Sequence, residues 1–198
     1  MMRSVARLDE TFLGRLRRRD PEALRRVVDE HSRRLYRAAR GMGHSTSEAE
    51  DLVQDVFVTF IESIERFEGR SQVSTWLFGI LHYKSQERRR AVVREELNDP
   101  VDQVFESQFD ARGSWVQSPS APDQHVSARE AAEAIRDCVD GLSPLQRDVF
   151  QLRQIEELSA AEVSKIVGQT ITHIGVLLHR ARTKLRTCLE GKGWGRSR

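Results

Sequence analysis

The segment 143–186 carries start and stop signals for three successive helices, and these signals predict a helix-turn-helix. Ser-Pro-Leu-Gln at 143–146 combines a capping box with a proline in the first turn. Ser-Ala-Ala-Glu at 159–162 is a second capping box, and Gly168 predicts the end of that helix. A cationic third helix is predicted over 171–186. A glycine-bearing turn before a cationic helix is a common device for placing side chains in a DNA groove.

The third helix has two predicted faces. Apolar positions at helical spacing predict an inward face of Ile171, Ile174, Leu177, Leu178, Ala181 and Leu185. The first outward positions should approach base edges, and the later cations should hold phosphates. The residues predicted to contact duplex DNA are Thr172, His173, Val176, His179, Arg180, Arg182 and Arg186. The alternative is a plain three-helix packing unit that binds no DNA.

The rest of the chain also repeats at helical spacing, so the predicted fold class is all-α. Helices are expected at 9–19, 20–40, 47–66 and 74–94, the third beginning with a capping box at 47–50, and another capping box at 127–130 opens the C-terminal part. The stretch 95–126 holds seven acids against one arginine, together with prolines and serines, and is predicted to be a flexible acidic linker. Two small helical domains at 9–94 and 127–190 are therefore expected, followed by a basic tail at 191–198.

The helix predicted at 47–66 has an apolar half and an acidic half. Asp51, Gln54 and Asp55 lie on the acidic half, and Val58 sits near its centre. This face is either a solvated surface with one stray valine or a docking surface for a basic partner.

Aromatic and cationic side chains alternate between residues 67 and 94. Rings can stack on unpaired bases while cations hold phosphates. The residues predicted to do so are Phe67, Arg70, Trp76, Tyr83, Lys84, Arg88 and Arg89. For Trp76 the competing interpretation is a place in the buried stripe of a helix, and for the arginine run it is a solvated helix end.

Several functional classes find no support. The histidines form no ligand-spaced pair with cysteine or acid, and no phosphate loop, nucleophile elbow or paired catalytic carboxylates occur, so neither an enzyme nor a metal or cofactor is expected. Cys138 and Cys188 are interpreted as buried thiols of a reducing compartment. Without a signal segment or an apolar stretch long enough for a membrane span, a cytoplasmic protein with no membrane insertion is predicted.

Three stretches together resemble the extracytoplasmic-function sigma factors, small bacterial members of the sigma-70 family. They are Ala-Glu-Asp-Leu-Val-Gln-Asp-Val-Phe at 49–57, Ser-Thr-Trp-Leu-Phe-Gly-Ile-Leu at 74–81, and Leu-His-Arg-Ala-Arg at 178–182 followed by Lys-Leu-Arg at 184–186. Two positions depart from the family pattern. Tyr83 stands where an asparagine is usual, and 173–177 lacks the usual polar and basic contacts, so no promoter sequence can be carried over.

The resemblance implies a role for each part of the chain. The face with Asp51, Gln54, Asp55 and Val58 would bind the clamp helices of core RNA polymerase. The segment 67–90 would capture and help to open the promoter's minus-ten element, and the C-terminal domain would read the minus-thirty-five element and touch the polymerase flap. The acidic linker would run near the RNA path, and an anti-sigma factor would hold the protein inactive. The alternatives are a stand-alone regulator that binds duplex DNA without polymerase, and a nucleic-acid enzyme whose required metal or nucleophile the sequence does not display.

Overall fold

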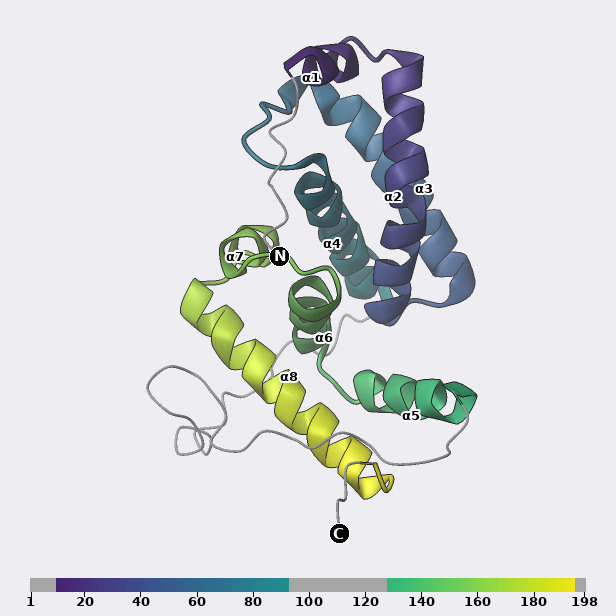
Figure 1. The fold of residues 1–198 in the computed structure, drawn as a ribbon, viewed down its shortest axis with the longest axis vertical. Helices are drawn as coiled ribbons and strands as arrows, with labels where there is room; N and C mark the ends of the chain where they lie inside the picture. Colours follow the sequence, from purple (N-terminus) through teal and green to yellow (C-terminus); the bar gives the residue numbers. More distant parts are fainter. Residues whose placement is uncertain (1–9, 93–127, 195–198) are drawn as a thin grey trace.

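The computed structural model describes residues 10–92 and 128–194, and each regular element in these two ranges is helical (Figure 1). The N-terminal unit contains α1 (Glu10–Arg17), α2 (Pro21–Gly41), α3 (Thr46–Ser63), the 3₁₀ turn η1 (Ile64–Arg66) and α4 (Val73–Val92). The C-terminal unit contains α5 (Ala128–Asp140), α6 (Pro144–Phe150), the π-helical turn η3 (Gln151–Ile155), α7 (Ala160–Val167) and α8 (Ile171–Gly191).

The all-α prediction and the C-terminal helix-turn-helix are confirmed. No helix of these two ranges is long and apolar enough to cross a bilayer.

Most of the predicted helix starts are present as hydrogen-bonded caps. Ser143 and Ser159 each form a reciprocal capping box, with Gln146 and Glu162 respectively. Gly168 ends α7 at a φ of 70°, a left-handed conformation that glycine adopts without a steric penalty. These contacts satisfy backbone groups that a helix end would otherwise leave without partners.

The capping residue of α3 lies two positions before the predicted one, and the helix begins at Thr46. The capping box pairs Ser45 with Glu48 instead of Ser47 with Glu50. Both pairs have the same serine-to-glutamate spacing, and the earlier serine caps because the turn after α2 ends there. The predicted box at 127–130 involves Ser127, which lies outside the described residues, as does the whole predicted linker 95–126.

The N-terminal core forms where α2, α3 and α4 pack side by side (Figure 1). The predicted apolar half of α3 supplies its buried face, made of Leu52, Val56, Phe57 and Phe60, and Ile64 continues this face into η1. Burying each such side chain stabilises the fold by about 1.5–3 kcal/mol relative to leaving it exposed.

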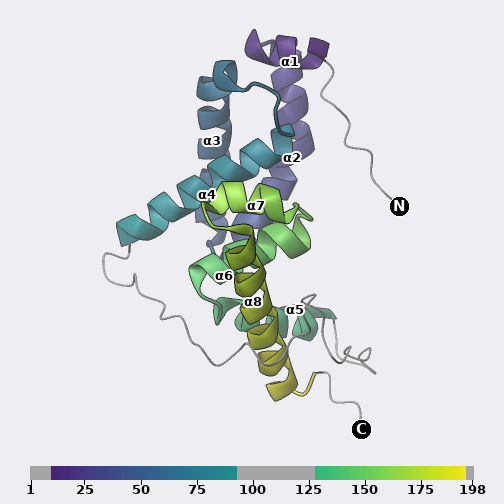
Figure 2. The same cartoon turned by 90° about the vertical axis from the view of Figure 1, so that its left-hand side faces the viewer.

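The two units pack against each other, which the sequence did not predict. Figure 2 shows α7 lying across α4, and α2 also contacts η3. One continuous apolar cluster runs from Leu16 in α1 to Leu178 in α8, and it includes Val163 and Val167 of α7. The helix-turn-helix is therefore part of the same packed body as α4.

The inward face of α8 is as predicted at five of six positions. Ile174, Leu177, Leu178, Ala181 and Leu185 are buried. Ile171 is 56% exposed, so its assignment to the core was wrong. As the first residue of the helix it has no neighbouring element over it, because helical side chains lean toward the N-terminus.

Cys138 and Cys188 form a disulfide, so their interpretation as thiols was wrong. The bond joins α5 to α8, which pack against each other and bring the two Cα atoms within 5.7 Å. This separation lies within the range that a disulfide needs. The sequence did not indicate this disulfide, because 50 positions separate the two cysteines and helical periodicity relates only residues that are close in sequence.

His44 is a buried side chain whose environment disfavours its charged form. It lies in the turn between α2 and α3, and its Nε2 is 2.5 Å from the hydroxyl of Ser85 in α4. Burial lowers the pKa of His44, and the charge of Arg89 lowers it further. Burial also lowers the pKa values of His31 and His179. All three imidazoles are therefore more easily protonated in the unfolded chain.

Breaking the disulfide should destabilise the C-terminal unit. Cross-linking residues 50 positions apart restricts the unfolded chain, and the chain-entropy estimate for such a loop is about 4 kcal/mol. We expect Cys138→Ser to lower the free energy of unfolding by about this amount in urea titrations without reductant. A reductant should lower the wild-type value equally and leave the variant unchanged, and a reductant-insensitive wild type would contradict the prediction.

Stability should fall as the pH drops from about 7.5 toward 5. The folded-state pKa values of His31, His44 and His179 lie below their unfolded values, so the stabilisation is complete above about pH 7.5 and is lost as protons bind the unfolded chain. Urea titrations at successive pH values would measure this decline. His44→Gln keeps a hydrogen-bonding group but cannot titrate, so its free energy of unfolding should fall less steeply with pH. A pH profile parallel to that of the wild type would refute the contribution of His44.

Candidate nucleic-acid interface

The predicted partner-binding face of α3 is on the surface. Asp51, Gln54 and Val58 are exposed, with Val58 at 55%, and Asp55 is half-buried. Arg88 of α4 donates a 2.9 Å hydrogen bond to Asp55, and its other terminal nitrogen lies 3.5 Å from Asp51. The face thus presents an exposed apolar side chain beside carboxylates that one internal arginine partly neutralises.

The aromatic residues predicted to contact unpaired DNA fall into two groups. Phe67 is buried and stacks on Trp76, with ring centroids 4.6 Å apart and nearly parallel planes. Trp76 also meets the ring of Phe60 edge-on at 5.4 Å. Both rings therefore serve the N-terminal core, as the competing interpretation of Trp76 had it, although part of Trp76 remains accessible. Tyr83 is 63% exposed and free to stack.

The cations of this segment are paired with acids of the same chain. Arg70 contacts Glu68, and the ammonium of Lys84 lies 3.2 Å from the carboxylate of Glu87. Such exposed pairs contribute at most about 1 kcal/mol and exchange readily for other anions. Arg88 is held by α3, and Arg89 is held by the C-terminal unit.

Residues of α8 predicted to contact duplex DNA differ in accessibility along the helix. Thr172 and Val176 are exposed one turn apart, and His173 is half-buried. His179 and Arg180 are half-buried farther along the helix. The first two turns thus form the most accessible part of the predicted recognition surface.

The two remaining predicted phosphate contacts on α8 have partners within the C-terminal unit. Arg182 donates a 2.8 Å hydrogen bond to Gln154, and Arg186 pairs with Glu190 at 2.7 Å. The Arg182 contact ties α8 to η3, a connection that helical periodicity does not indicate.

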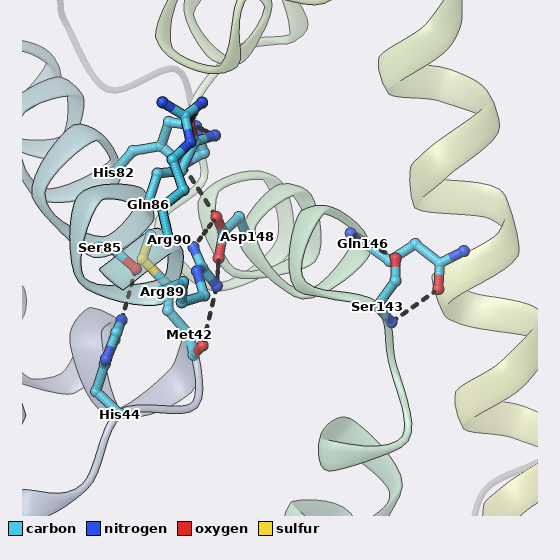
Figure 3. Close-up of polar contacts among 10 residues, drawn as sticks. All are labelled: Met42, His44, His82, Ser85, Gln86, Arg89, Arg90, Ser143, Gln146 and Asp148. Carbon is cyan, nitrogen blue, oxygen red and sulfur yellow. Dashed lines mark hydrogen bonds and ion pairs between the residues drawn. The ribbon is translucent and has the colours of Figure 1, made fainter. Parts of the chain in front are cut away.

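Three carboxylates of the C-terminal unit accept hydrogen bonds from the N-terminal unit. Asp148 is 1% exposed and receives both terminal nitrogens of Arg89, at 2.5 and 3.1 Å (Figure 3). Glu156 is 5% exposed and receives Nε of Arg34 at 2.5 Å. The third carboxylate is Glu162, which accepts the hydroxyl of Thr75 at 2.7 Å.

Glu162 illustrates how these contacts favour the ionised carboxylate. Burial alone raises its pKa, but hydrogen bonds from Ser159 and Thr75 outweigh that effect and lower the pKa below its ordinary value. Removing one partner of a buried ion pair typically costs about 3–5 kcal/mol, because it leaves a charge without compensation. Loss of Arg89 or Arg34 would leave the buried carboxylate of Asp148 or Glu156 in that position.

A groove of about 690 Å³ runs between the units. Its walls include Ile135 and Ile155, which are 50% and 58% exposed, and the arginines Arg37 and Arg136. Among the residues that the structure describes, no group of histidine, cysteine and acidic side chains is arranged to hold a metal ion.

Comparisons with known proteins agree on one family. The model of Sigma-70 region 2 matches residues 27–95, and the model of Sigma-70, region 4 matches residues 132–185. A "Probable RNA polymerase sigma factor" of Haemophilus influenzae is 30% identical over 158 residues, which cover 73% of this chain and 78% of that protein. The "ECF RNA polymerase sigma factor SigX" of Bacillus subtilis is 27% identical over 171 residues, covering 85% of this chain and 84% of the relative.

Solved structures share the fold over most of the chain. CnrH, in complex with the cytosolic domain of CnrY, superposes with a TM-score of 0.66 at 21% identity, covering 92% of this chain and 97% of CnrH. The sigma factor RpoE of Bartonella quintana, in complex with the anti-sigma factor NepR, gives 0.61 at 24% identity, covering 84% of this chain and 96% of RpoE. The chain therefore belongs to the sigma-70 family of RNA polymerase sigma factors and, within it, to the extracytoplasmic-function group.

Proposed function

We propose that this chain directs transcription initiation as a specificity subunit of RNA polymerase, without catalytic residues of its own. The observation that carries the proposal is the presence, in one chain, of an exposed acidic and apolar α3 face and a helix-turn-helix with an accessible recognition surface. One surface suits a protein partner with basic side chains, and the other suits duplex DNA. A cytoplasmic location follows from this function.

The α3 face is the proposed contact with core polymerase. Val58 would enter an apolar pocket of the partner, while Asp51, Gln54 and Asp55 would supply polar contacts around it. An apolar centre surrounded by polar groups is the usual arrangement of a protein interface. Arg88 contacts Asp51 and Asp55 in the free chain, and cations of a basic partner can take its place there.

Charge reversal on α3 should weaken core binding. We expect Asp51→Arg combined with Asp55→Arg to raise the dissociation constant for core polymerase by about tenfold or more, because each change places a cation opposite a basic partner. Asp29→Arg is the matched control, since Asp29 is an exposed helical acid of α2 on another surface. Equal affinity of the double variant and the control in a binding titration would remove this assignment.

The segment around α4 is the proposed minus-ten site. Tyr83 is available for stacking, and Arg70, Lys84 and Arg88 have carboxylate partners that DNA phosphates can replace. Phe67 and Trp76 support this surface from the core side, and the accessible part of Trp76 can contact a base. Arg89 completes the set once it leaves Asp148.

The exposed start of α8 is the proposed minus-thirty-five reader. Thr172 can hydrogen-bond a base edge, and Val176 can meet a thymine methyl group. His173 and His179 flank these positions, while Arg180, Arg182 and Arg186 would contact phosphates.

Transcription with purified core enzyme tests the whole proposal. We expect the chain to give promoter-dependent run-off transcripts, and Val176→Asp to reduce them by roughly 5- to 150-fold, as the loss of a base contact does. Thr187→Asp, an exposed position late in the same helix, is the control. Transcripts at the core-only level on every genomic promoter would refute the sigma function. Tight duplex binding by the free protein, unchanged by core enzyme, would instead favour the stand-alone regulator.

An anti-sigma factor is the proposed inhibitor. The related RpoE was solved in complex with the anti-sigma factor NepR, and the exposed Val58 would suit a partner that covers the polymerase-binding face. The groove between the units offers a second apolar surface, with Ile135 and Ile155 beside two arginines. A partner that covers both places would block α3 and span the two units at once.

A further inference from the structure

The first two turns of α8 contain no acid, lysine or arginine. Residues 171–179 read Ile-Thr-His-Ile-Gly-Val-Leu-Leu-His, and the first cation of the helix is Arg180. The exposed residues of this stretch are Ile171, Thr172, Gly175 and Val176. Figure 1 shows this end of α8 at the left edge of the molecule, next to α7. The accessible start of the proposed recognition helix is therefore apolar apart from one hydroxyl group.

This composition limits which base edges the face can recognise. A guanine is commonly read by arginine or lysine and an adenine by asparagine or glutamine, each through paired hydrogen bonds. None of these residue types occurs at 171–179. The nitrogen-bearing side chains nearby are half-buried, and they are His173, His179 and, in the turn before the helix, Gln169. The group of the major groove that an apolar side chain recognises is the C5 methyl of thymine.

Ile171 and Val176 provide two apolar contacts on this face. Ile171 is 56% exposed, and Val176 is 40% exposed. Five positions of helix separate them by a rise of about 7.5 Å, which is close to two base steps of about 3.4 Å each. The two side chains can therefore reach methyl groups of different base pairs. One exposed apolar residue needs no explanation, but two on a face that meets the major groove match the methyl groups there.

Gly175 leaves space between these two side chains. It is exposed, and within the part of the chain that the structure describes a Cβ at this position would meet nothing within 4 Å. Packing thus gives no reason for a residue that costs a helix interior up to about 1 kcal/mol relative to alanine. A missing side chain allows the helix backbone to approach a ligand closely, so that the short side chains of Thr172 and Val176 can reach the base edges.

We propose that α8 identifies its promoters mainly by thymine methyl groups of the minus-thirty-five element, which Ile171 and Val176 contact. The inference rests on the proposed function of α8 and names the chemistry that this site recognises. It also gives a role to Ile171, whose exposure the apolar pattern did not indicate. The cations from Arg180 onward hold phosphates and add affinity without sequence information.

Deoxyuridine tests this inference because it pairs with adenine as thymine does and lacks only the C5 methyl. The template is a genomic promoter that gives run-off transcripts with this chain and core enzyme, with each thymine of the minus-thirty-five segment replaced by deoxyuridine. The control template carries the same replacement in the spacer between the two promoter elements. Burial of one methyl group is worth about fourfold in affinity, so losing two should lower the transcript yield at limiting holoenzyme by about tenfold. The control template should match the unmodified promoter.

A double variant shows whether these two side chains sense the methyl groups. Ile171→Ser combined with Val176→Ser replaces both apolar side chains by small hydroxyl groups. It should transcribe the thymine template about as weakly as the wild type transcribes the deoxyuridine template, and it should transcribe both templates equally. Thr187→Ser, at an exposed position late in the same helix, is the matched control and should keep the wild-type ratio between the templates. Melting followed by circular dichroism confirms that each variant is folded.

The inference is overturned if deoxyuridine leaves transcription by the wild type unchanged, or if active promoters carry no thymine in this segment. It is also overturned if the double variant keeps the wild-type ratio between the templates, since the apolar pair would then serve another contact, such as one with a protein. A wild type that initiates at promoters but is insensitive to deoxyuridine leaves the sigma function intact and removes methyl recognition alone. Transcripts at the core-only level on every genomic promoter would remove both.

Discussion

Two buried carboxylates determine how the halves of this molecule meet. Asp148 and Glu156 lie almost wholly inside the protein, and a charge in that environment needs close partners of opposite sign. The C-terminal unit gives Glu156 only an amide hydrogen bond from Gln151. The cationic partners are Arg89 from α4 and Arg34 from α2. The positions of these two arginines on α4 and α2 therefore help to determine where the helix-turn-helix packs on the N-terminal unit.

The local structure could be predicted because its causes lie within a few residues of each other. A serine and the glutamine or glutamate three positions later define the starts of α6 and α7, and Gly168 defines the end of α7. Apolar spacing likewise identified the buried faces of α3 and α8. It failed at the edges. Two overlapping serine-to-glutamate pairs competed for the start of α3, and Ile171, the first residue of α8, is more than half exposed despite its apolar spacing.

The contacts between distant parts of the chain could not be predicted in this way. Arg34 and Glu156 are 122 positions apart, and Arg89 and Asp148 are 59 apart. No periodicity links such pairs, and each member looks like an ordinary surface charge in the sequence. The disulfide between α5 and α8 was missed for the same reason. The candidate DNA-binding residues were found by composition, but composition could not tell that Trp76 stacks on Phe67 or that Arg89 is already occupied.

The arginines of α4 differ in the strength of their ion pairs, and so in how readily a DNA phosphate could replace each carboxylate partner. Arg88 pairs with acids that are about half exposed or more, where an ion pair is worth at most about 1 kcal/mol and a phosphate can compete directly. Arg89 pairs with a buried acid, and leaving that carboxylate uncompensated costs several times more. Removing Arg89 therefore costs more than removing Arg88 as long as Asp148 stays buried. On the proposed function of α4, a DNA phosphate would therefore compete for Arg88 more readily than for Arg89.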